Sequence, residues 1–337
     1  MIALLKRTES GLRVTIVLSR HLGVGFLYIC FMKLNLIILF SFFSLNYTFS
    51  QDTLLKIVQL DDVIISEQKN GFSVEDFISY VKNDTTFYKG FKHLRYFKHS
   101  YNSKLNIYNK KDEKIGELNR HGTHYVDSNK AWVIDDSLNY LGKIYKRNGD
   151  YKYYTTEAFD EVFFPYDTVN VSLSISKKKN NDESQNMRDA KTIGFSIGTD
   201  NVKQSKGGAS KRFAIFDIDM QKYYDYIISD TIYLGKPCYV FTVKVKENLT
   251  KNDREKALIR KVLSYFDKDN FNVIYREYKF VYKNWLIDLD MDVVVYLDYI
   301  DNYHVPTKII YDGFWKVLFF KKEKADFSLN LYNYHIR

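Results

Sequence analysis

Residues 287–298 alternate between apolar and mostly polar side chains, and this alternation constrains the fold more than any other feature. A strand directs successive side chains to opposite faces, so the pattern predicts a long antiparallel strand with one buried face. The opposite face carries Asp288, Asp290 and Asp292 and is expected to meet solvent. The predicted apolar row consists of Ile287, Leu289, Met291, Val293, Val295 and Leu297.

Short polar segments divide the chain that follows, which predicts a meander of antiparallel strands. The predicted turns are 301–302, 312–313 and 321–324, and the predicted strands are 305–311, 314–320 and 327–334. The neighbouring strands should bring Ile309, Leu318, Leu329 and Leu331 close to the apolar row. The composition agrees, because 17% of the residues are aromatic and such side chains favour strands.

The first part of the chain predicts a mixture of helices and strands. Ser73 is a candidate N-cap for a helix whose apolar face includes Phe77 and Val81. Thr85 or Thr86 is expected to cap a second helix that reaches Leu94. The other predicted elements are a strand at 60–66, strands at 104–108, 115–118 and 151–154, and a helix at 250–265.

These elements predict an α+β fold that is mainly antiparallel β, a curved sheet or half-barrel meander with a few packed helices. A stretch rich in Lys, Asn, Asp, Ser and Gly at 176–212 is interpreted as a surface loop. It separates an N-terminal α+β half at 51–175 from a β-meander half at 213–337.

The apolar run after Lys33 has the parts of a secretory signal peptide. One charge, about a dozen mostly apolar residues and the small residue Ser50 before a polar start predict a signal at 32–50 that is cleaved after Ser50. On this interpretation residues 1–31 are an upstream extension, and the chain is exported to the periplasm or to the outer membrane. The alternative is an uncleaved anchor at 22–49, which Lys33 would interrupt.

Charge and cysteine content exclude several classes of partner. Five of the 50 Lys and Arg residues and one of the 41 Asp and Glu residues lie in the first 50 positions, so the remainder holds 45 basic against 40 acidic residues. Without a clustered basic stripe, no nucleic-acid partner is expected. Cys30 lies in the leader, so Cys238 has no intrachain disulfide partner after cleavage, and no cofactor is predicted.

Three constellations suggest chemistry, but their contexts argue against it. Residues 194–198 match the G-x-S-x-G pattern around Ser196, yet polar and glycine-rich flanks do not form the strand and helix that a nucleophile elbow requires. Asp288, Asp290 and Asp292 lack the Gly and Glu of a calcium loop. His121 and His124 have no third ligand nearby, so they are expected to be solvated in a polar turn. No catalytic and no metal site is predicted.

The aromatic residues near position 280 and the apolar row are the candidate ligand-binding residues. Side chains of alternate residues would wall an apolar cavity or, in the alternative, fill an ordinary core. The candidates are Tyr278, Phe280, Tyr282, Ile287, Leu289, Met291, Val293 and Val295.

Residues from Ser264 to Tyr334 resemble the lipoprotein-carrier (LolA-like) fold. The resemblance is carried by the strand–turn–strand at 265–273, with Asp267, and by a hairpin at 296–310, with Val305-Pro306-Thr307. It implies a curved antiparallel sheet, helices on its concave side and a cavity for acyl chains. Residues 71–78 and 84–95 resemble a family of uncharacterised exported proteins of Gram-negative bacteria, and that resemblance implies no activity.

The expected function is therefore that of an exported envelope protein without a catalytic site that binds a lipid or another apolar ligand. The alternative is a structural or accessory protein that binds an envelope protein. A remote alternative is a serine esterase that acts through Ser196.

Overall fold

A computed structural model describes residues 5–8, 11–14, 54–69, 71–128, 130–164, 169–170, 214–283, 287–317 and 322–336. The chain divides into two units, Met1–Gln51 and Asp52–Arg337. In the first unit, β1 (Leu5–Thr8) pairs with β2 (Gly11–Val14) in an antiparallel hairpin. The predicted signal peptide, its cleavage point, the polar loop and Ser196 lie outside the described residues.

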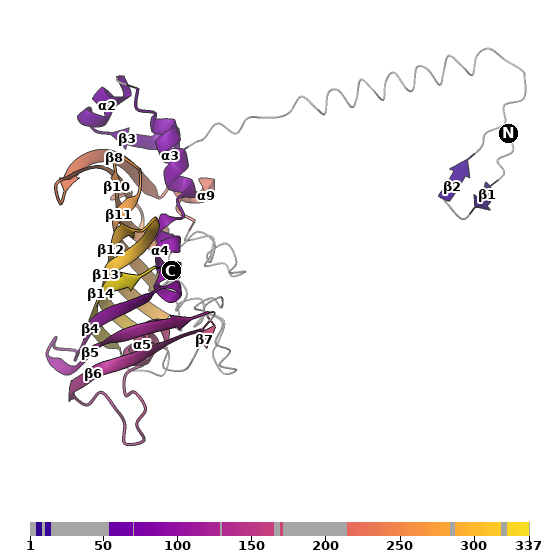
Figure 1. Ribbon diagram of the computed structural model, residues 1–337. Coiled ribbons are helices and arrows are strands. Elements are labelled where there is room, and N and C mark those ends of the chain that lie inside the picture. The colour runs from indigo at the N-terminus through magenta and orange to yellow at the C-terminus, as the bar shows by residue number, and fades with distance from the viewer. Residues whose placement is uncertain are drawn as a thin grey trace, which may run out of the picture. The chain divides into compact units, whose positions relative to one another are not determined.

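The second unit is built on one twelve-stranded curved sheet that is not closed (Figure 1). The strand order is β3-β8-β9-β10-β11-β12-β13-β14-β4-β5-β6-β7, and the one parallel pair among these is β3 with β8. The strands are β3 (Val58–Leu60), β4 (Lys98–Tyr108), β5 (Lys114–Asp127), β6 (Lys130–Gly142), β7 (Val169–Asn170), β8 (Tyr224–Tyr233), β9 (Lys236–Val245), β10 (Ile259–Asp267), β11 (Val273–Lys283), β12 (Ile287–Ile300), β13 (Tyr303–Val317) and β14 (Glu323–His335).

Some helices come before most of the strands in the chain, and others lie between strands in the sequence. They are η1 (Leu55–Ile57), α2 (Asp62–Lys69), α3 (Val74–Asn83), α4 (Thr86–Tyr96), α5 (Tyr154–Phe163), α9 (Ile218–Gln221) and α10 (Lys251–Lys256). The prediction of an α+β fold that is mainly antiparallel β in a curved sheet is confirmed. In the described part of the chain, no helix combines the length and the apolar character needed to cross a membrane.

One row of paired residues runs across the sheet and defines its inner face. Residues directly opposite in neighbouring strands share a face, so the pairing can be followed from strand to strand. The row reads Val58, Tyr226, Val243, Val262, Tyr278, Val293, Tyr311, Phe327, Leu105, Leu118 and Tyr140. Most of these side chains are buried, and their union in one row shows that both halves of the chain build a single core.

Helices α3, α4 and α5 pack on the inner face. Phe77 of α3 packs its ring on Tyr239 and Phe266, and Phe159 of α5 stacks on Phe327 at 4.3 Å between centroids. Figure 1 shows α3 and α4 following each other along one side of the curved sheet. The outer face carries the predicted aspartates of β12, and Lys279 lies 3.1 Å from Asp290 and 2.7 Å from Asp292.

Two predicted elements are wrong because tertiary pairing or a cap decides the local structure. Only Val58–Leu60 pairs with β8, and the predicted strand at 60–66 is mostly helix α2, because the Asp61 carboxylate accepts the Ile64 N–H at 2.9 Å. The predicted helix at 250–265 ends at Lys256, because residues from Ile259 pair with both β9 and β11.

A predicted turn and a further predicted strand are also wrong. Residues 312–313 are not a turn but lie inside β13, where Gly313 faces Met291 and Ala325. A Cβ atom on Gly313 would lie 2.2 Å from the Asp290 carbonyl oxygen, so the glycine permits close approach of two strands. The predicted strand at 151–154 contains only the isolated bridge of Tyr151 to Tyr145, and Tyr154 begins α5.

Candidate functional site

The structure brings the predicted ligand-binding residues of β11 and β12 together on the inner face. Three direct pairs join them: Tyr278 with Val293, Phe280 with Met291 and Tyr282 with Leu289. Apart from Tyr282, which is partly exposed, these side chains are buried, and so is Val295. The side chain of Ile287 lies outside the described residues, as does Leu318. Ile309 and Leu329 continue the row beside Val295, as predicted.

Helix α4 covers this region of the inner face and is attached to it by an ion pair. Phe87 meets the ring of Tyr278 edge to face at 6.3 Å. Arg276, two residues before Tyr278 and on the same face, lies 3.3 Å from Asp84 just before the helix. It also donates to Ser264 at 2.8 Å and lies 4.7 Å from the centre of the Phe87 ring. Burial lowers the pKa of Arg276, and Asp84 partly offsets that effect.

Helix α5 covers the neighbouring part of the face with a second buried ion pair. Arg120 of β5 lies 2.5 Å from Asp160, and their side chains are 2% and 17% exposed. The guanidinium donates to the Tyr151 hydroxyl and lies over the Phe164 ring at 4.7 Å. Burial raises the pKa of Asp160, and Arg120 partly offsets this effect. The ion pair therefore fixes the last turns of α5 to the sheet.

The first turn of α5 is capped by a residue distant in sequence. The Glu323 carboxylate accepts the Tyr154 N–H at 3.1 Å, the Thr155 N–H at 2.9 Å and the Thr155 hydroxyl at 2.7 Å. A carboxylate is favourable at a helix N-terminus because it meets unsatisfied N–H groups and the positive end of the helix dipole. Both ends of α5 are thus held by strands of the sheet.

The Tyr278 hydroxyl is a polar group inside this apolar interior. The side chain is 1% exposed, and its oxygen has no hydrogen-bond partner among the described residues. Burial raises the pKa of Tyr278, so the hydroxyl stays protonated and remains a donor. A buried donor without a partner costs about 1–3 kcal/mol, so a ligand group that accepted this hydrogen bond would recover part of that cost.

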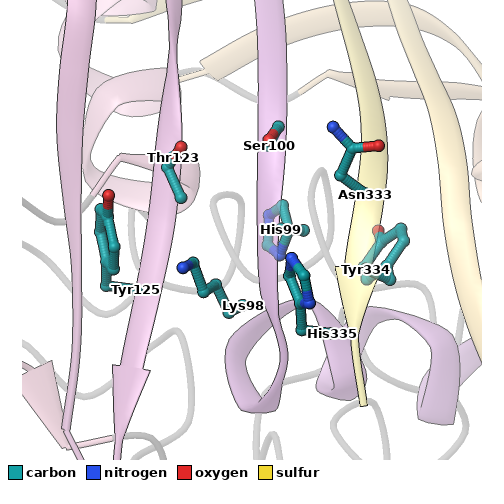
Figure 2. Close-up of a pocket in the computed structure, with 8 residues that line it drawn as sticks. All are labelled: Lys98, His99, Ser100, Thr123, Tyr125, Asn333, Tyr334 and His335. Carbon is teal, nitrogen blue, oxygen red and sulfur yellow. The ribbon is translucent and has the colours of Figure 1, made fainter.

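A second feature is a pocket of about 590 Å³ at one end of β5, β4 and β14 (Figure 2). Outer-face residues of these strands line it, together with two inner-face rings and a residue in a bulge. The lining residues are Lys98, His99, Ser100, Thr123, Tyr125, Asn333, Tyr334 and His335. None of the eight is acidic.

Two stacked imidazoles lie at this end of the sheet, and one of them, His99, also lines the pocket. His99 and His124 face each other with ring centres 4.7 Å apart, and both are buried. Their Nδ1 atoms lie 2.8 and 3.3 Å from the same carbonyl oxygen of Phe97. Burial, and secondarily the charge of His124, lowers the pKa of His99 to about 3, and burial lowers that of His124 to about 4. Both rings are therefore neutral near pH 7.

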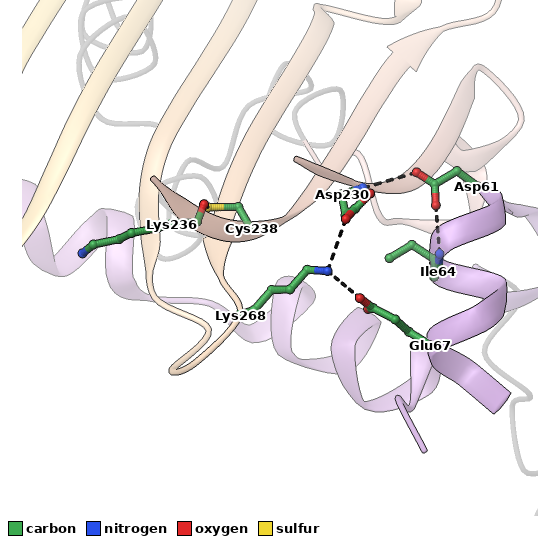
Figure 3. A network of polar contacts seen from close by, with 7 residues as sticks. All are labelled: Asp61, Ile64, Glu67, Asp230, Lys236, Cys238 and Lys268. Carbon is green, nitrogen blue, oxygen red and sulfur yellow. Dashed lines mark hydrogen bonds and ion pairs between the residues drawn. The ribbon is translucent and has the colours of Figure 1, made fainter. Parts of the chain in front are cut away.

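A polar network attaches α2 to the sheet (Figure 3). Lys268, in the turn after β10, lies 2.5 Å from Glu67 of α2 and 3.4 Å from Asp230 of β8. Asp61 accepts the Asp230 N–H at 3.3 Å and also caps α2. Cys238 is buried close by, and burial raises the pKa of its thiol, which opposes nucleophilic reactivity. This network explains the position of α2 and contains no reactive group.

The structure separates the two histidines that sequence analysis placed in a polar turn. They lie inside β5 on opposite faces: His121 is exposed beside Asp136 at 3.4 Å, whereas His124 is buried. The expectation that both are solvated is therefore wrong for His124. In the described part of the chain, no three His, Cys, Asp or Glu residues gather in a way that could hold a metal ion.

Sequence reasoning missed Arg120, Arg276 and Glu323, although one of them left a signal. Arg276 has the same strand parity as Tyr278 and Phe280, so a charged side chain occupies an inward position of an aromatic row. A charge at such a position requires a buried partner, which predicts an ion pair but not its identity.

No protein-family model matches the sequence, and no curated protein matches it. Among solved structures, the chain is similar to a DUF1329 family protein from Desulfovibrio piger ATCC 29098, at 12% identity over 74% of this chain and 92% of that chain, with a TM-score of 0.22. It is also similar to a putative outer membrane lipoprotein-sorting protein domain from Vibrio parahaemolyticus, at 11% identity over the same shares of the two chains, with a TM-score of 0.26.

A third similarity is to a structure of lipid–protein interactions in lipovitellin, at 9% identity over 71% of this chain and 25% of that chain, with a TM-score of 0.23. At these TM-scores, the three similarities do not indicate a function for this chain.

Proposed function

We propose that the chain is an exported, non-catalytic binding protein that takes a lipid or another apolar ligand between the inner face of its sheet and helices α4 and α5. Export is supported by the signal-peptide pattern at 32–50. The observation that carries the proposal is the unpartnered hydroxyl of Tyr278 within the apolar row. A ligand with a polar head and an apolar body would satisfy that hydroxyl while its chain lies along Val293 and its neighbours.

The attachment of the helices is compatible with ligand entry. Helix α4 is fixed by the pair of Arg276 with Asp84, and α5 by the pair of Arg120 with Asp160. A buried ion pair adds little net stability compared with apolar packing of the same volume. Opening would also separate Phe87 from Tyr278 and Phe159 from Phe327, so the apolar chain of the ligand would have to replace these ring contacts.

Native mass spectrometry of the purified chain, followed by displacement of a fluorescent fatty acid, tests the proposal. We expect bound lipid in the first measurement and saturable binding in the second. Tyr278→Phe should weaken fatty-acid binding severalfold without lowering the melting temperature, because it removes a hydroxyl that is unsatisfied in the free protein.

Tyr275→Phe is the matched control, since Tyr275 lies on the same strand but on the outer face. It should leave fatty-acid binding unchanged. Absence of bound lipid together with absence of saturable fatty-acid binding would refute the proposal.

A second candidate function, binding of a protein partner, is favoured by the edge of the sheet at β6. Within the described residues, β7 pairs only with Lys130 and Ala131, so the rest of this edge of β6 has no strand beside it. Ile134, Tyr140 and Leu141 are 50%, 53% and 64% exposed there. An apolar open edge can accept another strand. Photo-crosslinking from position 139 should capture one partner, and Leu141→Lys should abolish the capture.

A further inference from the structure

The pocket at the ends of β5, β4 and β14 combines polar donors in a regular arrangement. Lys98 pairs directly with His335 across β4 and β14, and Ser100 pairs directly with Thr123 across β4 and β5. All four residues share the outer face. Opposed Cβ atoms lie about 5 Å apart, and residues two apart on a strand about 7 Å apart. The four side chains therefore frame an area the size of one phosphoryl group and its ester linkage.

Among the described residues, no side-chain hydrogen bond or ion pair uses the polar groups of this frame. The Lys98 ammonium lies 4.9 Å from the centre of the Tyr125 ring, and no described carboxylate forms an ion pair with it. Within the described part of the chain, no protein group accepts a hydrogen bond from the Ser100 or Thr123 hydroxyl. Because the pocket lining has no acidic residue, its electrostatic potential favours an anion.

A bulge in β14 adds another donor to the pocket. The register shifts between Tyr332 and His335, and Asn333 has φ of 54°, in the left-handed region. Asn tolerates this conformation better than most residues, and the extra residue redirects a side chain out of the regular alternation. The Asn333 amide thereby lines the pocket on the side of Ser100 (Figure 2).

We propose that this pocket binds a phosphoryl oxyanion, held by the Lys98 ammonium, the Ser100 and Thr123 hydroxyls and the Asn333 amide. Three acceptor oxygens of a phosphate ester match several donors contributed by three strands better than the two oxygens of a carboxylate do. The group belongs to a lipid head or to a soluble phosphate ester. The four residues that would hold the group lie outside the inner-face row around Tyr278, so the site is independent of the function proposed above.

Binding to the full chain tests the proposal with two probes of the same chemistry. Isothermal titration calorimetry measures glycerol 3-phosphate, and sedimentation measures vesicles of phosphatidylcholine with and without phosphatidate. We expect saturable binding of at least one phosphoryl probe and weaker binding of glycerate. Binding of glycerol 3-phosphate assigns the site to soluble esters, whereas binding of phosphatidate vesicles alone assigns it to lipid heads.

Lys98→Gln should weaken binding of the phosphoryl probe about tenfold, as expected for loss of one charge-assisted hydrogen bond. Asn333→Gly keeps the left-handed backbone and removes only the amide, so it should weaken binding severalfold. Lys104→Gln is the matched control, because Lys104 lies on the same strand and face but pairs with Glu117. It should change the affinity less than twofold.

Two results would overturn the proposal. One is that neither phosphoryl probe binds saturably. The other is an equal loss with Lys98→Gln and Lys104→Gln, which would show general attraction by the positive net charge. If the pocket does not bind a phosphoryl group, the expected fatty-acid binding by the wild type and by Tyr278→Phe is unchanged. The two proposals are therefore tested separately.

Discussion

Helices α4 and α5 occupy the same face of the sheet and are attached to it by similar ion pairs, yet their ends are held differently. Each pair joins an aspartate of a helical segment to a strand arginine that lies over a phenylalanine ring. For α4 the aspartate is Asp84, which also caps the helix by accepting the Thr86 N–H at 2.9 Å. For α5 the cap comes from Glu323, which is distant in sequence.

The two helices therefore depend on the sheet to different degrees. Helix α4 has a local cap, so its N-terminus can form before the strands assemble. Helix α5 has no side-chain cap from its own N-cap residue, Tyr153, and depends on β5 and β14 at both ends. We therefore expect α5 to lose more than α4 when a contact with the sheet is removed.

The largest expected effect is the loss of a buried arginine. Arg120→Met should lower the free energy of unfolding by about 3–5 kcal/mol, because Asp160 remains inside the protein without its counterion. Arg276→Met should cost less, since Asp84 retains the hydrogen bond from the Thr86 N–H. Urea denaturation measures both values. Lys104→Met should stay within about 0.5 kcal/mol, because Lys104 is half-exposed and its partner Glu117 retains the ion pair with Lys114. A greater loss with Arg276→Met than with Arg120→Met would reverse the comparison.

The next effect is a loss of stability at acid pH, and it involves two histidines near the C-terminal end of α4. The Phe97 carbonyl, just after α4, accepts from His99 and His124, whose pKa values are lowered from 6.5 to about 3 and about 4. The unfolded chain binds protons near pH 6.5 but the folded chain does not, so stability is complete above pH 6.5 and falls with pH through about 4 and 3. At pH 5 the loss is on the order of 2 kcal/mol per histidine.

The pH dependence of stability contributed by Asp160 of α5 has the opposite sign. The pKa of Asp160 is raised from 3.8, so its contribution to stability is present below pH 3.8 and is lost as the pH rises through the folded value. Urea midpoints measured between pH 7.5 and 4.5 test the contribution of the two histidines. The midpoint should fall over this range in the wild type and fall less in His99→Gln/His124→Gln. Equal slopes for the two proteins would show that other groups control the acid response.

The two helix caps provide a smaller contrast. Glu323→Ala should cost about 1.5–3 kcal/mol, because three donors at the start of α5 lose a charged acceptor. Ser73→Ala should cost about 1 kcal/mol, because Ser73 accepts only the Asp76 N–H of α3. Thermal unfolding followed by circular dichroism compares them. If Ser73→Ala proved the more damaging, the remote cap would be of minor importance.

The same distinction separates what sequence could predict from what it could not. The helix after Ser73 was predicted because its cap lies three residues from the N–H that it accepts. Helix α5 was not predicted, because nothing near Tyr154 reveals Glu323. The period-two row of β12 predicted its own buried face, since side-chain direction is a local property of a strand.

The candidate site follows the same rule. Tyr278, Phe280 and the row of β12 could be placed on one face from their alternation, whereas their covering helices required the fold. The phosphoryl pocket could not be predicted at all. Lys98, Thr123 and Asn333 belong to three different strands, and only the register of the sheet brings them together. In addition, Asn333 lies in a bulge that breaks the alternation of side chains.

The smallest expected effect tests the start of α4 itself. Sequence predicted Thr85 or Thr86 as its cap, but the Thr85 side chain makes no capping hydrogen bond and Asp84 accepts the Thr86 N–H instead. Thr85→Ala should therefore change the free energy of unfolding by less than about 0.5 kcal/mol, as for a surface substitution. Asp84→Asn is the matched comparison and should cost more, because it weakens both the cap and the pair with Arg276. Urea denaturation resolves the two. A loss of about 1 kcal/mol with Thr85→Ala, which is typical of a cap residue, would return the cap to Thr85 and make α4 independent of the residue that attaches it to the sheet.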